Sequence, residues 1–214
     1  MVAVSNYPDM RSTKTGLILC LLLANAARPQ SQPSGRAAFL DRLATAAMAR
    51  SNLSVRYDSA YVRIAYPNGD VPANTGVCTD EIIRAYRTLG IDLQKEVHED
   101  MEKNFSVYPN QRRWMLSHTD ANIDHRRVPN LQVFFSRNGE SLPITTRGQD
   151  YAPGELITWD LGGGVPHIGI VVHEKSSDGR RYLIEHNIGA GPKLEDVLFS
   201  WKITGHYRYF GPSH

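Results

Sequence analysis

Three residues of this chain have the types and order needed for nucleophilic catalysis. Cys78 stands in the segment Gly76-Val-Cys-Thr-Asp80, His167 opens an apolar run that is rich in β-branched residues, and His186 follows later in the chain. A cysteine nucleophile attacks as its thiolate, so it needs a neighbouring base, and that base needs a third group to orient its ring. The order cysteine, histidine and polar residue is therefore compatible with nucleophilic catalysis by a thiol.

The predicted helix around Cys78 bears on whether this thiol is reactive. Asn74 or Thr75 can cap a helix that runs to Leu89 and ends at Gly90, which places Cys78 near its N-terminus. Unpaired N–H groups and the positive end of the helix dipole favour an anion there, so a thiolate would be stabilised. The alternative is a small buried side chain that packs the start of the helix. Both interpretations stay open at the level of sequence.

The two histidines are expected on neighbouring strands. His167 follows the Gly162–Gly164 turn and begins one strand, while His186 and Asn187 end the next one. In a hairpin, the end of one strand lies beside the start of the other. Because successive side chains point to opposite faces, only one of the latter two can orient His167. We favour His186 and keep Asn187 as the alternative; Glu185 shares the face of Asn187.

The elements that must position these residues change type along the chain. Helical patterns come first, strand patterns follow, and the polar stretch 104–130 between them is irregular, which in a compact domain favours a functional loop. This order predicts an α+β domain with N-terminal helices on an antiparallel β-sheet. The expected helices cover 37–50, 74–89, 93–101 and 131–137; the expected strands cover 57–66, 156–159, 167–172, 182–187 and 201–209.

Composition limits the function classes. The 214 residues are 41% hydrophobic and 21% charged, as in an ordinary folded protein, and their net charge is only +2. Nucleic-acid-binding domains usually carry a clustered basic face, so we expect no nucleic-acid partner. No apolar run reaches about 18 residues, the length needed for a helix to cross a bilayer. The sequence therefore predicts no transmembrane span.

The N-terminus has the pattern of a secretory signal. Arg11 and Lys14 precede the apolar run Gly16–Ala24, and Ala24-Asn-Ala26 provides small residues for cleavage. We predict a signal peptide over 1–26, a flexible leader over 27–35, and a single domain over 36–214 in the periplasm or outside the cell. Cleavage would remove Cys20, and an exported protein with a single cysteine cannot form an internal disulfide.

Several motifs together resemble a known superfamily. The segments around Cys78, His167 and His186 look like the papain-like cysteine peptidases and amidases of the NlpC-type cell-wall branch. More closely, the chain resembles a family of exported bacterial proteins, described as a domain of unknown function, within that branch. The segments that carry this closer resemblance are Tyr66-Pro-Asn-Gly-Asp70, Gly76-Val-Cys-Thr-Asp80, Asn122-Ile-Asp-His-Arg-Arg127, His186-Asn-Ile-Gly189 and Gly205-His-Tyr-Arg208.

The resemblance implies a papain-like fold and the hydrolysis of an amide bond in peptidoglycan stem peptides. It makes Cys78 the nucleophile, His167 the base and His186 the orienting residue, with no cofactor. Members of the branch usually have Asp before the cysteine and Ser/Thr-Gly after it, whereas Val77 and Thr79-Asp80 stand here. We expect Asp80 to stabilise the helix N-terminus, although a carboxylate near the thiol raises its pKa.

The expected substrate-binding residues are Arg126, Arg127 and Asn187. The arginines could hold a carboxylate of a peptidoglycan or muropeptide substrate through bidentate hydrogen bonds. Alternatively, they form a solvated pair in a loop.

Two other functions compete with hydrolysis. A histidine metal site would use His167, His173, His186 and also His206, but the sequence lacks a His-Glu-x-x-His pattern, so we predict no metal. A wall-binding module would keep the fold without the activity.

Overall fold

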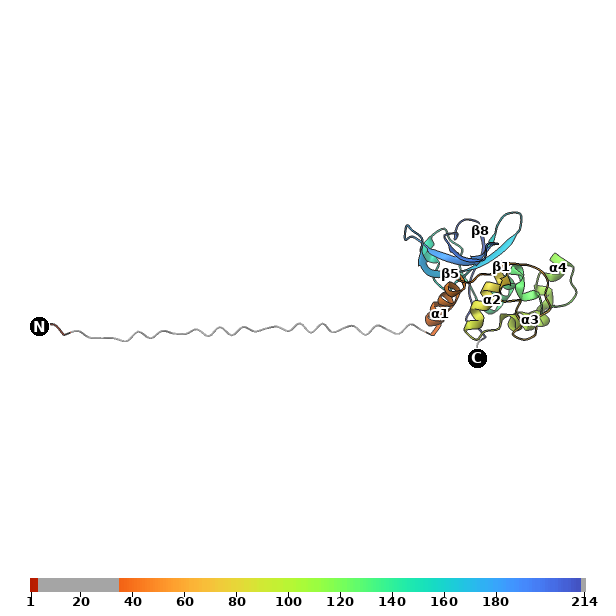
Figure 1. Cartoon of the computed structure of the whole chain (residues 1–214), viewed down its shortest axis with the longest axis horizontal. Coiled ribbons are helices and arrows are strands. Elements are labelled where there is room, and N and C mark those ends of the chain that lie inside the picture. Colours follow the sequence, from red (N-terminus) through yellow and green to blue (C-terminus); the bar gives the residue numbers. More distant parts are fainter. Residues whose placement is uncertain (4–34, 213–214) are drawn as a thin grey trace. The chain divides into compact units, whose positions relative to one another are not determined.

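The computed structural model describes residues 1–3 and 35–212, and residues 35–212 have an α+β architecture, as the sequence predicts (Figure 1). The predicted signal peptide and leader fall mainly on residues 4–34, which lie outside the described residues. The α-helices are α1 (Gly35–Arg50), α2 (Cys78–Thr88), α3 (Leu93–Asn104), α4 (Asn110–Trp114) and α5 (Val128–Asn138). The 3-10 helices are η1 (Phe105–Val107), η2 (Asp124–Arg126) and η3 (Gly148–Asp150). The strands are β1 (Arg56–Tyr57), β2 (Thr75–Gly76), β3 (Glu140–Ser141), β4 (Leu156–Asp160), β5 (Pro166–Lys175), β6 (Tyr182–Asn187), β7 (Pro192–Glu195) and β8 (Lys202–Arg208).

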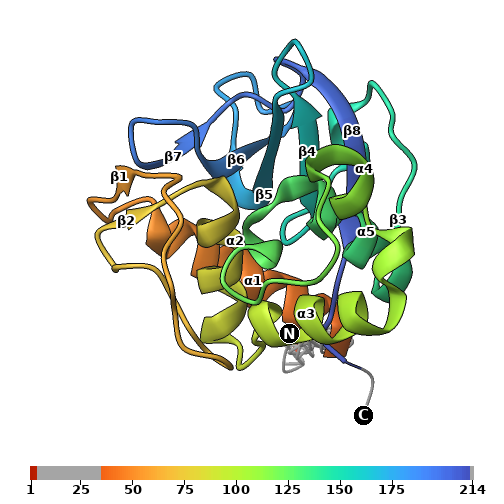
Figure 2. The ribbon, with the colours of Figure 1, turned by 90° about the vertical axis from the view of Figure 1, so that its right-hand side faces the viewer.

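The main sheet has six strands in the order β3-β8-β4-β5-β6-β7, and every neighbouring pair is antiparallel. Strands β4, β5 and β6 follow one another in sequence and in space, because short turns join them. A separate parallel pair, β1 and β2, lies immediately before α2 (Figure 2). This small pair brings the chain to the start of the helix that carries Cys78.

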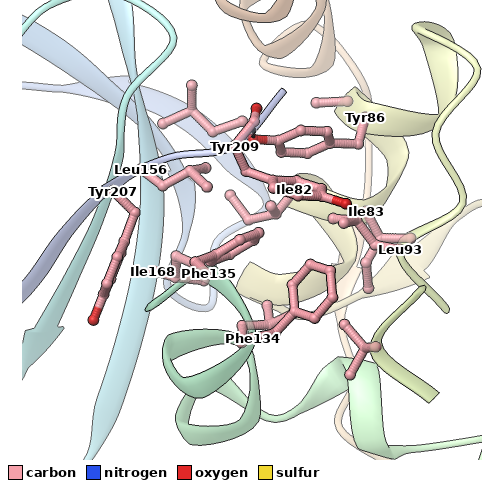
Figure 3. Close-up of a cluster of buried hydrophobic side chains, with 14 of the residues drawn as sticks. Ile82, Ile83, Tyr86, Leu93, Phe134, Phe135, Leu156, Ile168, Tyr207 and Tyr209 are labelled. Carbon is pink, nitrogen blue, oxygen red and sulfur yellow. Dashed lines mark hydrogen bonds between the residues drawn. The ribbon is translucent and has the colours of Figure 1, made fainter. Parts of the chain in front are cut away.

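The sheet has a hydrophobic cluster on each face, because alternate side chains of a strand point to opposite sides. The larger cluster packs the helices against β5 through Ile168, Ile170 and Val172. Figure 3 shows its aromatic part, where Tyr86 of α2 and Phe135 of α5 lie between the sheet and the helices. The smaller cluster covers the other face and contains Tyr151, Ile157, Trp159, Val171, Ile184 and Leu198.

Helix α2 starts two or three residues later than the capping pattern suggests, because its N-cap is Val77 and not Asn74 or Thr75. Thr75 donates its hydroxyl to the Pro72 carbonyl, so it does not cap a helix. The guanidinium of Arg84 pairs with Asp70 and also donates to the carbonyls of Val71, Pro72 and Thr75, which holds this stretch extended. The helix therefore begins at Cys78, closer to the thiol than expected.

Other predicted elements also differ. The strand expected over 57–66 is only Arg56–Tyr57, and the rest is irregular because its polar groups bond to loops, as the Ile64 N–H does to Asn122 Oδ1 at 2.9 Å. Part of the irregular stretch 104–130 forms η1, α4 and η2. Strands β3 and β7 are too short to leave a periodic pattern, and the sequence did not predict them.

Candidate functional site

Cys78 is the first residue of α2 and lies against the start of β5. The residue is 5% exposed, and the backbone N–H groups of Ile168, Thr79 and Cys78 itself bond to the thiol. Hydrogen bonds hold Val77 and Thr79, the residues on either side of Cys78. Asp80 Oδ2 accepts a hydrogen bond from the Val77 N–H at 2.7 Å, as expected for a residue that stabilises the helix N-terminus, and Thr79 donates to the Arg126 carbonyl at 3.0 Å.

His167 and His186 are brought together at the splayed ends of β5 and β6. The paired residues of these strands run only as far as Ile170 and Glu185 on this side. Beyond that point the side chains meet instead: His167 Nε2 lies 2.8 Å from His186 Nδ1, and His186 Nε2 lies 2.9 Å from Glu195 Oε2. Of the two alternatives for the orienting residue, the structure places His186 against His167.

The chemistry of Glu195 sets the proton positions along this chain of groups. A carboxylate only accepts, so His186 Nε2 donates to it, and the Nδ1 atom of a neutral His186 is then an acceptor. His167 Nε2 consequently donates to His186, which leaves the lone pair of a neutral His167 on Nδ1. Nδ1 is therefore the atom of His167 that can take a proton.

Burial keeps both imidazoles neutral. The pKa of His167 is lowered to about 3 by burial and by the neighbouring His186. Burial also lowers the pKa of His186, against the attraction of Glu195. Indole rings enclose the pair: the Trp159 ring centroid lies 5.9 Å and the Trp201 centroid 6.0 Å from that of His167. The resting site thus holds a neutral base with a carboxylate behind it.

The thiol and the imidazole approach the start of β5 from opposite faces of the sheet. Cys78 packs with Ile168 in the cluster under the helices, whereas His167 contacts Trp159 of the other cluster. Within the described part of the chain, no hydrogen bond joins the sulfur to an imidazole nitrogen. Direct proton transfer between them would therefore require the end of β5 to rearrange.

The expectation of a stabilised thiolate is wrong for this resting arrangement. Burial raises the pKa of the Cys78 thiol to about 12, and the charge of Asp80 adds to the increase. The backbone N–H groups at the thiol do lower its pKa, as the helix N-terminus predicts, but their effect is smaller than that of burial. Cys78 is thus a neutral thiol at rest.

The raised pKa predicts a slow reaction with alkylating agents. At pH 8.5 we expect folded Cys78 to react with iodoacetamide at least about 100-fold more slowly than a free thiol, whose pKa is about 8.5. Peptide mass spectrometry would follow Cys78 separately from Cys20, and protein unfolded in guanidinium provides the control. An inflection of the rate below pH 8.5 would contradict the assignment.

Arg126 is almost completely buried, and its guanidinium is engaged within the protein. Nε and Nη2 bond to the two carboxylate oxygens of Asp80 at 2.8 and 3.0 Å. Nη1 donates to the Ala60 carbonyl at 3.1 Å and Nη2 to that of Asp58 at 3.3 Å. The bidentate face expected to bind a substrate carboxylate is thus occupied by Asp80.

Arg127 and Asn187 have different surroundings. The Arg127 guanidinium lies over the Trp114 ring, 4.4 Å from its centroid, and donates to Asp124 at 3.0 Å. Asn187 is buried on the helix-facing side of β6; its Oδ1 accepts from the Gly189 N–H at 3.2 Å, and its Nδ2 has no partner. A substrate-binding role for either residue stays a prediction.

Sequence reasoning missed two polar residues of the site. Glu195 lies on β7, where Lys193 pairs with His186, and the Gly189–Gly191 turn after β6 was the signal that a further strand follows. Tyr57 pairs with Gly76 in the small parallel sheet. This pairing places Tyr57 beside Gly76, two residues before the start of the helix that carries Cys78, and partial burial raises the pKa of its hydroxyl. No periodic pattern pointed to Tyr57.

The four histidines of the metal hypothesis do not gather. His206 bonds to Glu155 at 2.7 Å and to the Pro143 carbonyl, and His173 lies beside Asp41, away from the pair on β5 and β6. Among residues 35–212, no group of three or more histidine, cysteine, aspartate or glutamate side chains could hold a metal ion.

Comparison with known proteins establishes the family. The profile of a family described as Domain of unknown function (DUF1287) matches residues 44–209. The chain belongs to the DUF1287 family. This DUF1287 protein is 53% identical over 154 residues to "Uncharacterized protein YijF" of Escherichia coli (strain K12), which covers 72% of the chain and 74% of that relative. No solved structure matches the chain significantly.

The range matched by the family profile includes every residue of the candidate site. Cys78, His167, His186 and Glu195 all lie inside the matched range, as do the segments that carry the closer resemblance. The described residues of this DUF1287 protein contain no helix that is long and apolar enough to cross a membrane.

Proposed function

We propose that this DUF1287 protein is a papain-like thiol amidohydrolase with Cys78 as nucleophile and His167 as base. One observation carries the proposal: the hydrogen-bonded chain Glu195–His186–His167 ends one residue before Ile168, whose N–H bonds to the Cys78 thiol. A carboxylate that orients a histidine is the usual way to hold a base in the correct tautomer and to stabilise its protonated form.

The proposed reaction starts from a neutral thiol and a neutral imidazole. As the Cys78 sulfur attacks the amide carbonyl carbon, its proton passes to His167 Nδ1, and Glu195 stabilises the imidazolium through His186. The C–N bond then breaks, the amine leaves with the proton from His167, and a thioester on Cys78 remains. Water attacks the thioester while His167 takes its proton, and this proton returns to the thiolate that leaves. The products are a carboxylic acid and an amine.

Backbone N–H groups at the start of α2 can stabilise the negative oxygen of the tetrahedral intermediate. The N–H groups of the first turn of a helix lack intrahelical partners, and they point along the helix axis toward a developing anion. At rest the N–H groups of Cys78 and Thr79 bond to the sulfur. In the proposed reaction at least one of them turns to the substrate oxygen.

Peptidoglycan stem peptides are the proposed substrates. The resemblance to NlpC-type enzymes and the predicted signal peptide both favour a wall substrate in the periplasm or outside the cell. The competing function is a wall-binding module of the same fold, and the buried, neutral thiol is the observation that favours it.

Mass spectrometry of stem peptides and protein together would test the proposal. We expect incubation of muropeptides with the full chain to yield two fragments whose summed mass exceeds the substrate by one water. Rapid acid quenching should reveal an acyl adduct that maps to Cys78. Heat-unfolded protein is the control. Tight binding of uncleaved muropeptides would support the binding module instead, and cleavage without an adduct on Cys78 would contradict the mechanism.

A further inference from the structure

A buried ion pair lies directly under the first turn of α2. The side chains of Arg126 and Asp80 are 2% and 3% exposed, and both oxygens of Asp80 bond to the guanidinium. Two charges removed from water require mutual pairing and further hydrogen bonds, and Arg126 obtains these from the Ala60 and Asp58 carbonyls. The pair therefore joins three segments: the start of α2, η2 and the chain that follows Tyr57.

The position of Asp80 requires such a counterion. The Oδ2 atom of Asp80 accepts a hydrogen bond from the Val77 N–H. Asp80 lies two residues after Cys78, so its negative charge opposes formation of a thiolate on Cys78. Arg84 also faces Asp80, but its Nε and Nη2 atoms bond to Asp70 at 2.9 and 3.2 Å. Arg126 is consequently the cation that binds the Asp80 carboxylate directly.

Packing around Gly76 is tight at this junction. A Cβ atom on Gly76 would lie 3.1 Å from Arg84 Nη1 and 3.2 Å from Asp80 Oδ2. The Thr79 hydroxyl bonds to the backbone carbonyl of Arg126, so the same residue holds the turn through its main chain and its side chain. The first turn of α2 is therefore tied to Arg126 through the hydrogen bond of Thr79 and the ion pair of Asp80.

We propose that Arg126 is a positioning residue for Cys78, which clamps the first turn of α2 and neutralises Asp80, rather than a ligand of the substrate. The inference rests on the proposed function for its biological meaning, because a reactive Cys78 needs a neutral surrounding. The inference predicts how Asp80 and Arg126 change the reactivity of the Cys78 thiol, so it can be tested without any hydrolysis.

The test compares single and double variants by the rate of Cys78 alkylation at pH 9, where the rate is proportional to the thiolate fraction. Asp80→Asn keeps an oxygen for the Val77 cap and leaves Arg126 unopposed, so we expect alkylation to become about tenfold faster, equal to one pKa unit. Arg126→Gln leaves Asp80 unopposed, so we expect about tenfold slower alkylation. The double variant, with no charge at either position, should lie within about threefold of the parent protein.

A merely structural pair would give a different pattern. Loss of either partner would then loosen the turn, and both single variants would react faster; that result would overturn the proposal. Because an unpaired buried charge can prevent folding, circular dichroism accompanies each variant. If Arg126→Gln does not fold, Arg126→Lys replaces it: it retains the cation, so we expect a parent-like rate, and a faster rate would again overturn the proposal.

The matched control is a second bidentate pair elsewhere in the domain. Arg137 Nε and Nη2 bond to Asp100 at 2.9 and 3.2 Å, and this pair joins α5 to α3; among the described residues, neither side chain bonds to the first turn of α2. Asp100→Asn and Arg137→Gln should leave Cys78 alkylation within about twofold of the parent. If the protein hydrolyses no stem peptide but shows the opposed shifts, the proposed function fails while the positioning role stands.

Discussion

Replacing Cys78 by serine or His167 by alanine is expected to lower kcat for stem-peptide hydrolysis by about 10⁴-fold. The nucleophile and the base act as a unit in the proposed mechanism, so either loss removes the same step, and the double variant should be scarcely slower than each single one. The resting protonation states strengthen this expectation. Because the thiol is neutral and its pKa is about 12, little thiolate exists to react without the base.

Substitutions behind His167 should have smaller, graded effects. His186→Ala removes the acceptor of the His167 Nε2 proton, which lies 2.8 Å away, and we expect kcat to fall by about 10²-fold. Glu195→Gln keeps a polar group at 2.9 Å from His186 but loses the charge that stabilises the imidazolium, so we expect kcat to fall by about tenfold.

Steady-state hydrolysis with the full chain would measure these changes, with thermal unfolding of each variant as a check on folding. His173→Ala is the matched control, since His173 is a histidine on the same strand that contacts Asp41 and takes no part in the site. Its kcat should stay within about twofold of the parent. Residual turnover by Cys78→Ser above one tenth of the parent rate would exclude a cysteine nucleophile.

The sequence was informative about the site wherever the signal was local. The placement of Cys78 near the start of a helix follows from the apolar stripe and the terminating Gly90, although the expected cap was wrong. The placement of His167 at the start of a strand follows from the glycine turn and the β-branched run, and the alternation of side chains put His186 and Asn187 on opposite faces. Each of these inferences needs only the period of one element.

What the sequence could not predict depends on contacts between distant segments. The Asp80–Arg126 pair joins residues 46 positions apart, and a loop arginine gives no sign that its fork is closed by a buried carboxylate. The pKa of the Cys78 thiol is similar: the helix N-terminus predicts a decrease, but packing of α2 on β5 removes the sulfur from water and reverses the sign. In both cases the outcome depends on which segments pack together in the fold, and the local sequence around each residue does not show this.

A second carboxylate beneath α2 should make the stability of the fold depend on pH. Glu185 of β6 is fully buried, and neither of its carboxylate oxygens has a partner. It faces Glu81 of α2 and Arg50 of α1, while its neighbours in the sheet, Ile170 and Leu194, are apolar. Burial, and then the charge of Glu81, raise the pKa of Glu185 well above its ordinary value, so the folded protein favours the protonated acid.

The direction of the pH effect follows from this raised pKa. The folded state holds the proton more tightly than the unfolded chain does, so its contribution to stability is complete below the unfolded pKa of about 4.3 and is lost as pH rises through the folded pKa. Glutamine has the same shape and stays neutral at every pH. We therefore expect Glu185→Gln to increase the free energy of unfolding by about 2 kcal/mol at pH 8, with little change near pH 4.

Urea unfolding of both proteins between pH 4 and pH 8 would measure this difference, because the change in midpoint at constant slope reports stability directly. Glu174→Gln is the control: Glu174 is exposed near the end of β5, so its stability curve should follow the parent at each pH. The charge of Arg50 acts in the opposite direction and lowers the pKa of Glu185. Arg50 Nε bonds to Glu81 at 2.5 Å, and its buried Nη2 has no partner. If Arg50 held Glu185 ionised, Glu185→Gln would instead destabilise the protein at pH 8, and the protonated assignment would be wrong.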